Sequence, residues 1–203
     1  MSARLLAALA MVAALGCEKK PAPAASEQEP GTTPAAQPSS ALPRPTTHGG
    51  AQELKISWQD VPGLDRLNQQ KPMRAASYAA PPAEGDKEPG DLGVFYFGAD
   101  QGGGVERNMK RWIGQFPDVP KDQVRRSQRT ENGLLLHIVE IEGGKFESGM
   151  PGGPKTPKGS YGLLGAIIEA PSGLYFFKLT GPQGTVKKAR DPFFKMLATV
   201  KAK

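Results

Sequence analysis

Residues 161–180 read YGLLGAIIEAPSGLYFFKLT, two apolar runs rich in β-forming side chains on either side of one short turn. Pro171 and Gly173 stand at the second and fourth positions of that turn, where a type I turn prefers them. We therefore expect residues 161–169 and 174–180 to form the two strands of a β-hairpin.

Other β-type runs lie upstream and are bounded by turn residues. Residues 134–142 read LLLHIVEIE and follow Asn132-Gly133, a dipeptide that favours a tight hairpin turn. Three shorter candidate strands are residues 55–59, 73–79 and 93–97. The strands do not alternate with helices over the length that a Rossmann unit needs, so that fold is excluded.

Residues 105–116 carry the spacing of an amphipathic helix. Counted from Val105, the other apolar residues fall at offsets of 4, 7, 8 and 11, on one face of a 3.6-residue helix. Glu106 stands four residues before Lys110, which is the favourable order for an ion pair along a helix. Pro117 is expected to end the helix.

A second helix is predicted at the end of the chain. Asp191 suits the N-cap and Pro192 the first helical position. Its expected buried face consists of Phe193, Met196, Leu197 and Val200. Strands in hairpin order, with one helix between them and one at the end, predict an α+β fold: an antiparallel β-sheet with packed helices.

The first seventeen residues read MSARLLAALAMVAALGC. The apolar run after Arg4 is shorter than the roughly 20 residues that span a bilayer, and it is typical of a signal peptide. The closing Ala-Leu-Gly-Cys resembles the bacterial lipobox, whose cysteine is acylated after the signal is cut. This resemblance implies a signal peptide over residues 1–16 and attachment to a lipid bilayer through acyl chains on Cys17. The alternative is an ordinary secretory signal with an incidental cysteine.

The segment after Cys17 has the composition of a tether. Residues 18–50 contain seven proline and six alanine residues and no aromatic residue, so they cannot bury enough apolar surface to offset chain entropy. We expect residues 17–50 to form a disordered tether and residues 51–203 a single globular domain. By analogy with a known sorting rule, Glu18 favours the outer over the inner membrane.

Several motifs of the domain resemble a group of bacterial exported proteins with a Mog1/PsbP-like fold. They are Trp58, Pro62, Met73-Arg74, Tyr78, residues 93–98, Gly102-Gly103, Asn108, Arg111-Trp112, Gln115-Phe116 and the FFKLTGP of residues 176–182. The resemblance covers about residues 55–200 and departs where Leu64 replaces a second tryptophan. It implies an antiparallel sheet between helices and an accessory binding protein, and it makes catalysis less expected.

Residues 143–159 hold nine glycine or proline residues and join two predicted strands. We interpret them as a long loop, a connection that is uncommon in compact domains and often functional. Its two large apolar side chains, Phe146 and Met150, are candidate contacts for a partner or ligand. The alternative is a disordered insertion.

Basic residues gather in sequence around the first helix and after it. They are Lys110, Arg111, Arg125, Arg126 and Arg129. This set is a candidate surface for anionic lipid, lipopolysaccharide or an acidic protein, and the alternative is an ordinary solvated surface. Export from the cytoplasm disfavours nucleic acid as a partner.

Candidate catalytic chemistry centres on His137. Strand alternation places it beside Leu135, Val139 and Ile141, where a histidine is more often structural than catalytic. One cysteine and two histidines in the whole chain predict no metal site, and we expect no cofactor. The sequence favours a lipid-anchored, non-catalytic binding or accessory protein of the cell envelope. The alternative is an envelope hydrolase using His137 or carboxylates near residues 143–159.

Overall fold

The computed structural model describes residues 54–69, 71–149, 153 and 155–203. Cys17, the predicted signal peptide and tether, and Met150 lie outside the described residues. The strands are β1 (Ile56–Ser57), β2 (Asp65–Arg66), β3 (Ala76–Ala80), β4 (Gly90–Tyr96), β5 (Val124–Glu131), β6 (Leu134–Ser148), β7 (Thr156–Ala170), β8 (Gly173–Pro182) and β9 (Lys201–Ala202). The helices are α1 (Val105–Ile113), α2 (Gln183–Lys188) and α3 (Arg190–Ala198), with one 3₁₀ turn, η1 (Lys121–Gln123).

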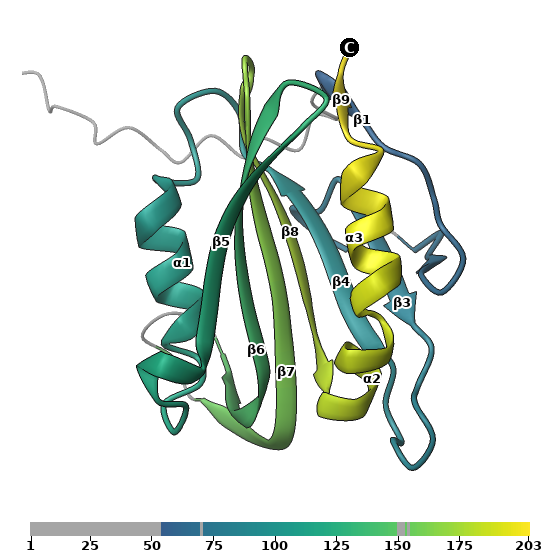
Figure 1. Cartoon of the computed structure of the whole chain (residues 1–203), viewed down its shortest axis with the longest axis vertical. Coiled ribbons are helices and arrows are strands. Elements are labelled where there is room, and N and C mark those ends of the chain that lie inside the picture. Colours follow the sequence, from purple (N-terminus) through teal and green to yellow (C-terminus); the bar gives the residue numbers. More distant parts are fainter. Residues whose placement is uncertain (1–53, 70, 150–152, 154) are drawn as a thin grey trace, which may run out of the picture. The chain divides into compact units, whose positions relative to one another are not determined.

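Seven strands form one sheet in the order β2-β3-β4-β8-β7-β6-β5, and each neighbouring pair is antiparallel. The chain builds β2 to β4, crosses one face of the sheet as α1, and returns strand by strand from the edge at β5 to β8. It then crosses the other face as α2 and α3, and β9 pairs with β1 in a separate two-stranded sheet. The sheet therefore stands between α1 and the C-terminal helices (Figure 1), and the predicted α+β class is confirmed.

The predicted hairpin forms around the expected turn residues, and the tight turn expected at Asn132-Gly133 also forms, with the unpredicted strand β5 as its first arm. Ala170 pairs with Gly173, so the β7–β8 turn consists of two residues. In the β5–β6 hairpin, Asn132 and Gly133 have φ angles of +49° and +80°. Those left-handed angles are what a two-residue turn of type I′ requires, and asparagine and glycine adopt them at low cost.

The sheet is buried on both faces because a helix covers each of them. Along β6, Leu136 and Ile138 point to the α3 side while Val139 and Ile141 point to the α1 side. On the α3 side the core includes Tyr78, Leu92, Val94, Phe177, Leu179, Phe193, Met196 and Leu197. On the α1 side it includes Met109, Trp112, Phe116, Leu163, Ile167 and Phe176.

Helix α1 ends at Ile113, earlier than the predicted residue 116, although Phe116 still packs into the core. The predicted ion pair between Glu106 and Lys110 is wrong, because the Glu106 carboxylate binds Arg126 instead. Strand β5 runs beside α1 and brings that guanidinium within reach.

The C-terminal helix begins at Arg190, and the Asp191 side chain makes no capping hydrogen bond, so the predicted N-cap is wrong. Helix α2 was not predicted and ends directly before α3. The N-cap of α3 is Ala189, whose carbonyl accepts the first bond of the helix from the Phe193 amide at 2.9 Å. The expected buried face of the helix, from Phe193 to Val200, is confirmed.

The prediction of a long loop over residues 143–159 is wrong. Strand β6 continues to Ser148 and β7 begins at Thr156, with register shifts near Gly144 and Phe146. A Cβ atom on Gly144 would lie 2.3 Å from the Val119 side chain, so this glycine permits close packing rather than a loop. Phe146 is only 7% exposed, which removes it as a candidate docking residue.

Candidate functional site

An aromatic cleft lies beside the C-terminal end of α1, over β4 and β8. We define it by Phe95, Phe97, Trp112, Phe176 and Lys178, with Arg111, Gly114, Gln115, Glu147, Gly149 and Lys155 completing its wall. Its volume is about 420 Å³. Apolar clefts of several hundred Å³ with a few convergent polar groups are typical of small-molecule sites.

The position of α1 leaves this cleft open. The helix packs on β6 and β7, where Trp112 lies against the bare backbone of Gly165: a Cβ atom there would be 2.7 Å from two indole carbons. The aromatic residues of β4 and β8 therefore flank the helix instead of lying under it. Phe176 is 6.3 Å from Trp112 and 5.6 Å from Phe97 between ring centroids, so the rings form one continuous wall.

Lys178 is the central polar group of the cleft. Its ammonium donates a hydrogen bond to Gln115 Oε1 and lies 5.9 Å from the Trp112 ring and 5.8 Å from the Phe146 ring. It forms no ion pair with a carboxylate among the described residues. Burial, together with the nearby Arg111 guanidinium, lowers the pKa of Lys178 to about 8.

The other charges around the cleft are mostly cationic. Arg111 donates to Asn108 Oδ1 at 2.6 Å and has no carboxylate partner among the described residues. Glu147 is the one acidic residue in the described wall, and it pairs with Lys155 at 2.7 Å. The cleft therefore presents an excess of positive charge next to an apolar surface.

The lowered pKa of Lys178 has a measurable consequence for stability. The folded state disfavours the charged amine, which lowers the free energy of unfolding. This destabilisation is fully present below pH 8 and disappears as pH rises from about 8 to 10.5. We expect Lys178→Met to raise the free energy of unfolding by about 1 kcal/mol at pH 7, a figure reduced because the side chain is only partly buried. Urea denaturation of both proteins from pH 7 to 10.5 tests this; a difference that stays constant over that range contradicts it.

A second concavity, the charged groove, lies between β5 and α3 on the opposite face of the sheet. Its volume is about 520 Å³. The guanidinium groups of Arg129 and Arg190 both contact the Phe194 ring, at 4.9 and 4.8 Å from its centroid. Arg190 also holds the buried carboxylate of Glu140 at 2.7 Å. These charges are matched within the groove and leave little for a ligand to neutralise.

The five basic residues that were predicted as one surface lie on both sides of β5. Arg125 and Arg129 face the α3 side, where Arg125 pairs with Glu142 at 2.6 Å and Arg129 with Glu131 at 3.0 Å. Arg126 faces α1 and pairs with Glu106. Lys110 and Arg111 lie on α1, and of the five residues only Arg111 lines the aromatic cleft.

His137 lines neither concavity among the described residues. Its Nδ1 is 2.9 Å from the Gln128 side-chain amide and its Nε2 is 2.6 Å from Glu169 Oε1. Both ring nitrogens therefore have hydrogen-bond partners on the neighbouring strands. The carboxylates of Glu142 and Glu147 are likewise engaged, by Arg125 and Lys155.

Sequence reasoning did not find the aromatic cleft, although one signal was present. In the run from Tyr175 to Thr180, Lys178 is the charged residue of an otherwise apolar strand, on the same face as Phe176. Lysine is rarely buried without a partner, so a lysine at an expected core position indicates a polar contact or a site there. The contribution of Gln115 and Arg111 depended on where α1 crosses the sheet, which the local sequence does not specify.

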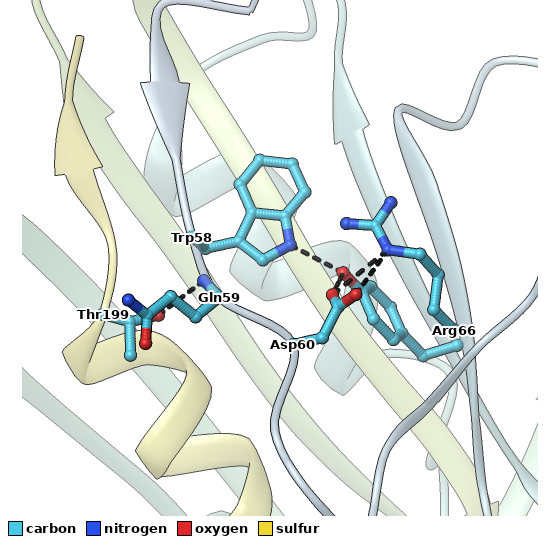
Figure 2. A network of polar contacts seen from close by, with 6 residues as sticks. Trp58, Gln59, Asp60, Arg66 and Thr199 are labelled. Carbon is cyan, nitrogen blue, oxygen red and sulfur yellow. Dashed lines mark hydrogen bonds and ion pairs between the residues drawn. The ribbon is translucent and has the colours of Figure 1, made fainter.

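A polar network fixes the first described segment of the chain (Figure 2). Trp58 Nε1 donates to the Tyr78 hydroxyl at 2.8 Å, and that hydroxyl donates to Asp60 at 2.6 Å. Arg66 Nε donates to the same carboxylate at 2.9 Å, and this contact is the main cause of the lowered pKa of Asp60. These hydrogen bonds attach residues 58–66 to β3.

Within the described residues, no group of three His, Cys, Asp or Glu side chains is arranged to hold a metal ion. No helix there has the length and apolar character needed to cross a bilayer.

Comparison with known proteins found similarity to solved structures only in the backbone fold. No protein-family profile matches the chain, and no curated protein matches it. One of the solved structures that it resembles is LpqN, described as involved in cell envelope biogenesis of Mycobacterium tuberculosis. That match has a TM-score of 0.49 and 10% sequence identity, and it covers 76% of this chain and 86% of LpqN. A similarity of this extent says nothing about a shared function.

Proposed function

We propose that this chain is a lipid-anchored protein of the bacterial cell envelope whose domain, residues 51–203, is a non-catalytic binding module. The aromatic cleft is its binding site. The observation that carries the proposal is a cleft of about 420 Å³ with the partly exposed rings of Phe95 and Phe97 in its wall and the buried Phe176 as its floor, because clefts lined by aromatic side chains are typical of ligand sites.

The anchor is supported by the sequence. The chain has one cysteine, and it stands where a lipobox would use it, after an apolar run and before a proline-rich segment. Acyl chains on Cys17 would hold the domain at a bilayer, and the tether would let it reach partners beyond the headgroups. The outer membrane is the favoured location on the identity of Glu18.

The binding role is supported by the resemblance of the domain to Mog1/PsbP-like accessory proteins. Fold resemblance alone supplies no specific partner. It supports binding as the proposed role of the domain and leaves the ligand to be identified by experiment.

Metabolic labelling with a palmitate analogue tests the anchor. We expect the wild-type chain to carry the label and to sediment with membranes, whereas Cys17→Ala carries none. Ser26→Ala, a change in the predicted tether, serves as the control and should label normally. Label that persists on Cys17→Ala would overturn the anchor.

Photo-crosslinking in cells tests the binding site. A photoreactive amino acid at Phe97, in the cleft, should give an adduct that intact mass spectrometry detects. The same amino acid at Lys195, which is exposed on α3 in the charged groove, is the matched control and should give none. No adduct at Phe97, or equal adducts at both positions, would contradict the proposed site.

A further inference from the structure

We propose that the aromatic cleft recognises a small organic acid: a carboxylate carried on an apolar body. The carboxylate meets Lys178 and Arg111, and the apolar body lies against Phe95, Phe97 and Phe176. This inference rests on the proposed binding function and adds the chemical class of the ligand.

Lys178 lacks an anionic partner that its neighbours have. Two other cations near the cleft are neutralised by the protein: Lys155 by Glu147 at 2.7 Å and Arg74 by Asp91 at 2.6 Å. Lys178, which is more enclosed, has no carboxylate partner among the described residues. An enclosed ammonium without an anion is costly, and the nearby aromatic rings and amide do not cancel its charge.

Two cationic side chains of the cleft keep unused hydrogen-bond donors. The Lys178 ammonium uses one of its three N–H groups, on Gln115 Oε1. The Arg111 guanidinium uses one contact, on Asn108 Oδ1, and its remaining N–H groups have no partner among the described residues. An ammonium and a guanidinium at one cleft can together bind the two oxygens of a carboxylate.

The aromatic wall of the cleft favours a ligand with an apolar body. Phe95 and Phe97 stack with ring centroids 6.1 Å apart, and both remain partly exposed on the cleft side of the sheet. Trp112 and Phe176, which are nearly fully buried, form the floor. A ligand with an apolar body would cover the exposed ring surface, so a free inorganic anion would leave most of the cleft unused.

The groups that face Lys178 determine the pH dependence of binding. They are Arg111 and Gln115 from the α1 side, Arg74 and Asp91 from the β4 side, and the Glu147–Lys155 pair from the end of the β6–β7 hairpin. A carboxylate ligand binds the protonated amine. Because burial lowers the pKa of Lys178 to about 8, affinity should fall as pH rises above that value.

The test is calorimetric titration of the full anchored chain in phosphatidylcholine nanodiscs, with empty nanodiscs as the blank. The probe is 2-naphthoate. Two matched probes separate its parts: 2-naphthalenemethanol keeps the rings without the charge, and acetate keeps the carboxylate without the rings. We expect 2-naphthoate to bind at least about tenfold more tightly than either, which is the effect of one charge-assisted contact or of one buried ring.

Three variants test whether Lys178 supplies the positive charge that binds the carboxylate. Lys178→Met should weaken 2-naphthoate binding about tenfold to a hundredfold, Lys178→Arg should retain most of it, and Lys195→Met should leave it unchanged. Equal binding of acid and alcohol, undiminished binding to Lys178→Met, or no binding of any probe would overturn the inference. If the organic-acid inference fails while Phe97 still forms its crosslink in cells, the proposed binding function remains, with a ligand of another class.

Discussion

Replacing Gly165 by valine should lower the free energy of unfolding by about 3 kcal/mol, since extra methyl groups forced into a packed core cost about 1–3 kcal/mol and more where the backbone must move. A Cβ atom at this position would lie 2.7 Å from two carbons of Trp112 and 2.9 Å from Val139 Cγ1. The indole is only 4% exposed and packs on Phe176, so either the ring must shift toward the aromatic cleft that it lines or α1 must move on the sheet.

Urea denaturation of the wild type and of Gly165→Val measures this loss. Gly159→Val is the matched control, because Gly159 lies on the same strand and a Cβ atom added there would have no neighbouring atom within 4 Å. The control should change stability by no more than about 0.5 kcal/mol, since valine suits a strand surface. If both variants lose the same amount, the contact with Trp112 is not what requires glycine at residue 165.

The same substitution connects stability to the cleft. Helix α1 carries Arg111 and positions Gln115, and both face Lys178. A helix displaced by the valine would move these donors away from the ammonium. Gly165→Val should therefore also abolish the crosslink from Phe97 under conditions where the domain is still folded.

Much of the fold could be predicted from local signals. The turn residues at 171–173 specified one hairpin, those at 132–133 specified a tight turn, and the apolar spacing from Val105 to Phe116 specified α1 and its buried face. These signals are local because a turn conformation or a helix face depends on a few consecutive residues.

The features that escaped prediction depend on distant parts of the chain. Strand β5 reads VRRSQRTE, which has no apolar face; it is an edge strand, and charged side chains there discourage pairing with another molecule. Gly143 and Gly144 were interpreted as loop residues. Their lack of a side chain instead accommodates Gln183 and Val119, which are far away in the sequence.

The aromatic cleft could not be predicted from the sequence for the same reason. Phe176 and Lys178 share one face of β8, but whether that face is covered depends on where α1 crosses. The packing of Trp112 against Gly165 fixes that crossing, and the two residues are separated by more than fifty positions in the chain. A single sequence does not report such a pairing.

The second large effect is expected for Tyr78→Phe, which should lower the free energy of unfolding by about 2 kcal/mol. The substitution removes only the hydroxyl from a fully buried ring. Trp58 Nε1 then loses its acceptor at 2.8 Å and Asp60 loses a donor at 2.6 Å. Each of these two hydrogen bonds is worth about 1 kcal/mol net, so losing both costs about 2 kcal/mol.

Tyr96→Phe is the matched control for this prediction. Its hydroxyl makes one hydrogen bond, to the Ser172 carbonyl at 2.7 Å, and the ring stays stacked on Tyr175. The control should lose about 1 kcal/mol, the usual net value of a single bond. Equal losses in the two variants would mean that the Tyr78 hydroxyl acts as an isolated contact and not as the centre of a network.

Alkaline pH separates the network from simple packing. Burial and the bond to Asp60 raise the pKa of Tyr78 to about 12, so the folded state keeps a proton that the unfolded chain releases near pH 10. The wild type therefore loses stability between pH 10 and 12, whereas Tyr78→Phe has no such group to titrate. The difference between the two proteins should shrink over that interval in urea denaturation, and a constant difference would show that Tyr78 does not hold its proton through this network.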